Sequence, residues 1–166
     1  KILIWGLFNT DMKNKYLISI CIPSYNRPSG IKRLLNSIDT GYVNEIQIVI
    51  CEDMAPKRME VREVVDEYGK STNYVLKYIE NPKNYGHGRN MREGIFQSEG
   101  DYIMFMGDDD KFISGEFDTF FNFVKDHQNV GYFLRSYAEL RADDKVEYFK
   151  YFNSDMFFEP GLDAYV

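Results

Sequence analysis

Three consecutive aspartates, Asp108, Asp109 and Asp110, follow the apolar run DYIMFMG (101–107). Adjacent carboxylates repel each other and stabilise neither helices nor strands, so the triplet needs either a solvated turn or a positive partner. Mg²⁺ and Mn²⁺ bind carboxylate oxygens, and in such sites they typically share their ligands with substrate phosphates. The triplet is therefore a candidate metal site, with a solvated turn as the alternative.

Apolar runs rich in β-branched residues alternate with amphipathic helical patterns along the chain. We expect strands over 16–22, 46–51, 74–80 and 101–107, the third near an edge because it alternates more. We expect helices from Pro28 to Gly41, around Val61–Tyr68, over 90–98 and around Phe117–Val124. Two further strands, 131–140 and 145–152, would form a hairpin around 142–144. Strands that alternate with helices imply an α/β fold with a mainly parallel sheet.

Each of the first four strands is followed by polar residues. The loops are PSYNR (23–27), Glu52-Asp53, NYGHGRN (84–90) and the aspartate triplet. Ligands of open α/β sheets bind beyond the carboxyl ends of the strands. Because parallel strands end at the same edge, we expect all four loops to form one ligand site.

Single residues of these loops admit two interpretations each. Tyr25 is either a stacking platform for a base or a packed turn aromatic. Gly86 and Gly88 either let amides approach a phosphate or relax the backbone before a helix. Arg89 is either a ligand contact or part of the solvated face of a helix. The spacing matches neither the Walker pattern nor GxGxxG directly after the first strand.

Composition narrows the class of protein. The 166 residues suffice for one domain, and the net charge of −6 argues against nucleic-acid binding through phosphates. The two cysteines, Cys21 and Cys51, lie in apolar runs and indicate buried free thiols in a reducing compartment. KILIWGLF is far shorter than the roughly 20 apolar residues of a membrane helix. Because the chain opens on Lys1, we expect it to be a piece of a longer protein.

Four segments carry a family resemblance. ISICIPSYNRP, IQIVICEDMAP, NYGHGRNMREGI and GDYIMFMGDDD, in this order and spacing, resemble the nucleotide-binding half of a family 2 glycosyltransferase across residues 16–112. The GDDD form is similar to the abequosyltransferase-like branch. The resemblance implies a GT-A fold, with a Rossmann-like, mainly parallel sheet flanked by helices. It also implies a single GT-A domain over 1–166 that lacks the C-terminal acceptor-binding part.

The resemblance also implies roles for residues. Tyr25 would contact the base, Arg27 the base or a phosphate, and Asp53 would accept a hydrogen bond from the base; the alternative for Asp53 is a cap of the following helix. One of the first two aspartates would touch the ribose, and one or two would hold a divalent ion. The implied nucleotide-binding residues are Pro23, Ser24, Tyr25, Arg27, Asp53, Asn84, Gly86, Arg89 and Asp108, and the implied metal ligands are Asp108, Asp109 and Asp110.

The activity implied is the inverting, metal-assisted transfer of a hexosyl or deoxyhexosyl group from a nucleoside-diphosphate sugar. A UDP-sugar is the expected donor, and a saccharide or lipid-linked acceptor of surface polysaccharide or glycolipid synthesis the expected acceptor. Mn²⁺ or Mg²⁺ would stabilise the diphosphate leaving group. We expect a cytoplasmic location, with peripheral contact at the inner face of the membrane.

Two alternatives stay open. One is a nucleotide-binding fragment without catalysis, since no catalytic base can be assigned in this chain. The other is a nucleotidyltransferase, which would show a Gly-rich, basic stretch where SYNRP stands. The chain also departs from the family's usual Asp-Asp-Gly-Ser, because Glu52-Asp53-Met54-Ala55 follows the second strand. This departure leaves the shape of that turn open.

Overall fold

The computed structural model describes residues 3–6, 15–140, 146–149 and 156–157. By its contacts the chain divides after Phe133 into two compact units, and each is described by itself. The prediction of a single domain over 1–166 stays a prediction.

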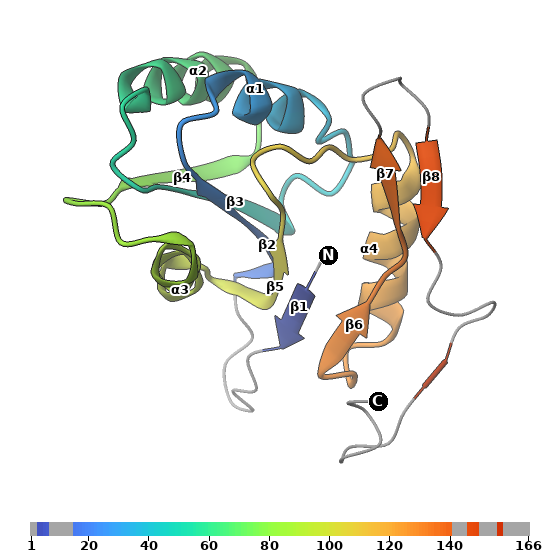
Figure 1. Cartoon of the computed structure of the whole chain (residues 1–166). Helices are drawn as coiled ribbons and strands as arrows, with labels where there is room; N and C mark the ends of the chain where they lie inside the picture. The colour runs from blue at the N-terminus through green and yellow to red at the C-terminus, as the bar shows by residue number, and fades with distance from the viewer. Residues whose placement is uncertain (1–2, 7–14, 141–145, 150–155, 158–166) are drawn as a thin grey trace. The chain divides into compact units, whose positions relative to one another are not determined.

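The first unit is built on a six-stranded sheet of order β4-β3-β2-β5-β1-β6 (Figure 1). Its strands are β1 (Leu3–Gly6), β2 (Tyr16–Ser24), β3 (Ile46–Glu52), β4 (Val75–Glu80), β5 (Gly100–Phe105) and β6 (Tyr132–Leu134). β2 pairs in parallel with β3 and β5, and β3 pairs in parallel with β4. The predicted parallel α/β sheet is confirmed, and β4 lies at its edge as expected. β1, which runs antiparallel to β5, was not predicted.

In the described part of the chain, four helices accompany the sheet. They are α1 (Pro28–Asn36), α2 (Arg58–Ser71), α3 (His87–Gln97) and α4 (Glu116–Asp126). α1 and α2 lie together on one face, and α3 lies on the other (Figure 1). The large core beneath α1 and α2 contains the isoleucines of β2 and β3, and the aromatic side chains of α4 belong to the same core. A smaller cluster around Cys21, Ile103 and Phe105 packs with Met91 and Ile95 of α3.

Several predicted boundaries shift. α1 ends at Asn36 rather than near Gly41, because the amide and hydroxyl of Ser37 both bond to the carbonyl of Leu34. α3 begins at His87 rather than at residue 90, after Gly86 at φ 79°. The predicted strand 131–140 is two strands, β6 and β7 (Tyr137–Leu140).

β2 also runs two residues further than predicted, through Pro23. Pro23 is half-buried and lies opposite Cys51 of β3. The pairing of β2 with β5 ends at Cys21 and Phe105. Backbone groups two residues apart in a strand point to the same neighbouring strand, so those of Pro23, like those of Cys21, point toward the side of β5. Because the β2–β5 pairing has ended before Pro23, its missing N–H removes no hydrogen bond from the sheet.

In the second unit, β7 pairs antiparallel with β8 (Val146–Phe149). This pairing confirms the predicted hairpin. Its expected turn at 142–144 lies outside the described residues.

The two cysteines are buried and free, as predicted. Burial raises the pKa of each thiol to about 12, so both remain protonated and unreactive at neutral pH. Their side chains instead shape the contact with α3, because a Cβ on Gly94 would lie 2.3 Å from the Cys21 sulfur and 3.6 Å from the Cys51 sulfur.

Gly94→Ala should therefore destabilise the protein by about 1–3 kcal/mol, the usual effect of overpacking. Removing the obstructing sulfur in Cys21→Ala should recover most of that loss in the double variant. Urea unfolding of the parent, both single variants and the double variant measures the coupling. Strictly additive effects would show that α3 does not contact β2 through this pair.

Candidate functional site

The carboxyl ends of β2, β3, β4 and β5 meet at one edge of the sheet because the four strands are parallel neighbours. Hydrogen bonds link the loops that follow them. The amide of Asp53 donates to the carbonyl of Ser24 (3.0 Å), and the amide of Asn81 donates to the carbonyl of Glu52 (2.9 Å). The predicted gathering of the polar loops at one edge is what the structure shows.

Asp108 is buried and has the positive partner that its position demands. Its Oδ2 accepts from the amide of Tyr25 (2.9 Å), and its Oδ1 accepts from Nη1 of Arg27 (2.7 Å). The same nitrogen lies 3.3 Å from Oδ2 of Asp109. Asp108 raises the pKa of the Arg27 guanidinium further above its usual value. Arg27 therefore neutralises part of the repulsion between Asp108 and Asp109.

The backbone of α1 lies directly against the aspartate turn. A Cβ on Gly30 would lie 2.3 Å from the carbonyl oxygen of Asp108, so a side chain there would displace the turn. Nη2 of Arg33 also donates to the carbonyl of Asp109. Two arginines, Arg27 at the N-cap of α1 and Arg33 in its last turn, thus hold the aspartate turn.

Asp109 and Asp110 are exposed, and their carboxylates approach the same point. Oδ1 of Asp109 and Oδ2 of Asp110 each lie 2.9 Å from the position that a Cβ on Gly107 would take. Oδ2 of Asp110 also accepts from the amide of Gly107 (3.0 Å). Among the described residues, no group of three or more acidic, histidine or cysteine side chains is placed to hold a metal. Two carboxylates that leave the remaining positions to phosphates and water fit Mg²⁺ or Mn²⁺.

Asp53 holds the loop before α3. Its Oδ1 accepts from the amide of Tyr85 (2.8 Å) and from Nδ2 of Asn81 (3.0 Å), and its Oδ2 accepts from the amide of Gly86 (2.8 Å). The helix-cap alternative is wrong, because α2 begins at Arg58 and its N-cap is Lys57. Contact of Asp53 with a base stays a prediction.

Two asparagines support Asp53: Asn81, which we did not predict as a site residue, and Asn90, the last residue of the predicted loop 84–90. Nδ2 of Asn81 also donates to Oδ1 of Asn90 (2.9 Å), and Nδ2 of Asn90 donates to the carbonyl of Cys51 (2.9 Å). Both side chains are buried. Their signal in the sequence is weak: Asn90 is a polar residue one turn before Gly94, on the face of α3 that packs on the sheet.

Asn84, Arg89 and Ser24 are predicted site residues whose contacts within the described part of the chain do not include Asp108, Asp109 or Asp110. Oδ1 of Asn84 accepts from the amide of Gly86 (2.9 Å). The guanidinium carbon of Arg89 lies 3.9 Å from the centroid of the Tyr85 ring, which favours a cation–π contact. Ser24 is buried at the last position of β2.

The turn after β3 forms without the family's glycine. Met54 takes φ 51°, and the amide of Ala55 donates to Oε1 of Glu52 (2.7 Å). Asn26, at φ 63°, accepts from the amide of Lys57 through its side chain (3.2 Å). The loops after β2 and β3 are therefore joined, and the turn survives the substitutions that left its shape open.

Glu52 is fully buried, and its Oε2 has no hydrogen-bond partner among the described residues. Burial raises the pKa of this carboxyl, although the amides of Ala55 and Met54 act in the opposite direction.

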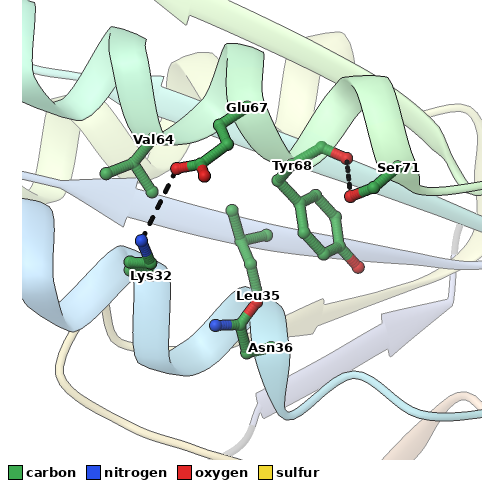
Figure 2. A pocket seen from close by; sticks show the side chains of 7 residues that line it. All are labelled: Lys32, Leu35, Asn36, Val64, Glu67, Tyr68 and Ser71. Atoms are coloured by element: carbon green, nitrogen blue, oxygen red, sulfur yellow. Dashed lines mark hydrogen bonds and ion pairs between the residues drawn. The ribbon is translucent and has the colours of Figure 1, made fainter.

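A shallow pocket elsewhere contains none of the predicted site residues (Figure 2). It lies between α1 and α2 and is lined by Lys32, Leu35, Asn36, Val64, Glu67, Tyr68 and Ser71. Its charged pair, Lys32 and Glu67 at 3.5 Å, is exposed, and such pairs contribute little. The strand ends, where many polar groups converge, are the better candidate site.

The family model of glycosyl transferase family 2 matches residues 19–162. The chain belongs to this family. It is 34% identical to abequosyltransferase RfbV of Salmonella typhimurium over 94 residues, and the aligned region covers 57% of this chain and 28% of that protein. It is 22% identical over 102 residues to a GalNAc(5)-diNAcBac-PP-undecaprenol beta-1,3-glucosyltransferase of Campylobacter jejuni, which covers 61% of this chain and 32% of that protein. The chain thus spans about a third or less of the length of these two relatives.

Solved structures show the same fold. TarS of S. aureus, solved with UDP-GlcNAc, superposes with a TM-score of 0.60 at 23% identity, over 68% of this chain and 32% of that one. The mannosyltransferase PcManGT of Pyrobaculum calidifontis, solved with GDP-Man and Mn²⁺, superposes with a TM-score of 0.59 at 15% identity, over 73% and 34%. The predicted GT-A fold and family are confirmed. Among the described residues, no helix is long and apolar enough to cross a membrane.

Asp108→Asn should destabilise the protein by about 1.5–3 kcal/mol. The buried carboxylate accepts from the Tyr25 amide and from the charged Arg27, and the NH₂ group of asparagine can accept neither bond, so one of the two is lost. Its exposed neighbour provides the matched control, and Asp109→Asn should change the free energy of unfolding by less than about 0.5 kcal/mol. Urea denaturation measures both. Equal effects of the two substitutions would contradict the anchoring role of Asp108.

Glu52→Gln should gain stability relative to the parent as the pH rises from 4 to 7. A carboxyl whose pKa is raised by folding favours the folded state at low pH, and this contribution is lost as the pH rises through its unfolded and then its folded pKa. The variant, whose carboxamide does not ionise, has no such loss. Urea unfolding at both pH values checks this, with Glu63→Gln on the exposed face of α2 as the control for net charge. A difference that does not change with pH would contradict ionisation at Glu52.

Proposed function

We propose that this domain binds the nucleoside diphosphate of a sugar donor at the carboxyl edge of β2–β5. The observation that carries the proposal is the aspartate turn itself. Asp108 fixes Tyr25 and Arg27 beside it, while Asp109 and Asp110 each place one oxygen 2.9 Å from a common point beside Gly107. A base platform, a cation and a pair of carboxylates are the groups that a nucleoside diphosphate with a divalent ion requires.

The proposed metal ligands are Asp109 and Asp110, with phosphate oxygens and water in the remaining positions. The ion would act as a Lewis acid on the diphosphate leaving group. That Asp108 also binds the ion stays a prediction, since Asp108 is buried with both oxygens bonded to Tyr25 and Arg27, whereas Asp109 and Asp110 are exposed. Arg27, with more than half of its side chain exposed, is placed to contact a phosphate.

For the whole protein we propose the transfer of a hexosyl or deoxyhexosyl group, with inversion, to a saccharide or lipid-linked acceptor. RfbV is named as a sugar transferase, and the Campylobacter relative is named for an acceptor on PP-undecaprenol. A UDP-sugar is the proposed donor, because TarS was solved with UDP and with UDP-GlcNAc. We propose a cytoplasmic site of action, where nucleotide sugars are available. The general base that inversion needs is not assigned to any residue of this chain.

Calorimetry with UDP, GDP and CDP, in Mn²⁺ and in EDTA, tests the proposal. UDP should bind in Mn²⁺ and at least about tenfold more weakly in EDTA, because the unscreened aspartates repel the diphosphate. Asp109→Ala and Asp110→Ala should each remove most of this metal dependence while leaving the melting temperature nearly unchanged.

Asp126→Ala, an exposed aspartate at the end of α4, is the matched control and should keep both affinities. Equal affinity in EDTA and Mn²⁺ would overturn the metal role. Binding of none of the three nucleotides would overturn the proposed function as a whole.

A further inference from the structure

Met54 has a large side chain at a position whose backbone conformation favours glycine. Its φ of 51° lies in the left-handed region, which residues with a Cβ rarely adopt and which Gly enters freely. The side chain is 42% exposed, so burial in the core does not repay the strain. A strained, non-glycine residue at a ligand edge is a ground for inferring a function of its side chain.

The position of Met54 is fixed from both sides. Asp53 before it is buried and accepts three hydrogen bonds, and Ala55 after it is buried and donates its amide to Glu52. The carbonyl of Glu52 is itself bonded to the amide of Asn81. The turn therefore presents the methionine at a defined place, at the end of β3.

Tyr25 lies on the neighbouring loop and is also exposed, at 47%. Ser24 and Glu52 are partners in the parallel register, and the amide of Asp53 continues that pairing to the carbonyl of Ser24. The side chain of Asn26 then joins the first loop to the amide of Lys57 in the second. Tyr25 and Met54, two exposed apolar residues, thus follow adjacent strand ends, and the amide of Tyr25 is bonded to Asp108 of the aspartate turn.

We propose that Met54 contributes to nucleotide affinity by contacting the nucleobase of the donor. A thioether is polarisable and binds well against an aromatic ring, and its contact reads the apolar face of the base rather than its hydrogen-bonding edge. The inference rests on the proposed function, because it assumes that the diphosphate lies at Asp109 and Asp110. It assigns to Met54 a contact with the base alone, and none with the diphosphate.

The test separates base from diphosphate by using UDP, GDP, CDP and inorganic pyrophosphate as ligands in Mn²⁺. Met54→Ala should weaken binding of the preferred nucleotide by about three- to tenfold and leave the affinity for pyrophosphate unchanged. Met54→Gly should weaken the nucleotide equally, yet raise the melting temperature, because Gly accepts the left-handed backbone without strain. Calorimetry and thermal unfolding of the full chain give these values.

Met59→Ala is the matched control, since Met59 is 52% exposed but belongs to the first turn of α2; it should change neither affinity. The inference is overturned if both Met54 variants bind the nucleotide like the parent. It is also overturned if nucleotide and pyrophosphate weaken together, since Met54 would then act through the shape of the turn. If the parent protein binds pyrophosphate but no nucleotide, or binds neither ligand, the result contradicts the proposed function itself.

Discussion

The parallel pairing of β2 with both β3 and β5 is the constraint on which the site depends. It aligns three strand ends that lie far apart in the sequence, and the hydrogen bonds beyond the ladder continue the alignment into the loops. The alternating isoleucines of β2 and β3 fix this register, because a shift by one residue would turn them away from α1 and α2. The positions of the polar residues thus follow from where the apolar residues must be.

Gathering polar groups at a buried edge is costly unless each finds a partner. Asp108 is satisfied by an amide and a guanidinium, and Asp53 by two amides and a carboxamide. Asn81 and Asn90 extend the second network down to the carbonyl of Cys51. The acidic residues at this edge therefore have two different roles. Asp53 and Asp108 hold loops together, which leaves Asp109 and Asp110 as the carboxylates that remain accessible.

The sequence predicted the parallel sheet because β2, β3 and β5 are buried on both faces and read as continuous apolar runs. It also predicted that the four polar loops would meet, because the edge of a parallel sheet leaves no other arrangement. It did not predict β1, whose four residues pair with a strand almost a hundred positions away. Nor did it predict the partners of Asp53, since periodicity identifies the elements that carry a side chain but not the donors brought to it by a distant loop.

Gly30 connects the helix packing to the acidic turn. Its α-carbon leaves no room for a methyl group against the Asp108 carbonyl, so backbone touches backbone where α1 meets the turn. The two segments are consequently one mechanical unit: the aspartates cannot be displaced toward α1 without moving the helix and the core beneath it. Gly30, which has no side chain, therefore limits how far the acidic turn can move. Inherited variation at Gly30 would alter the ligand site, although the residue contributes to helix packing alone.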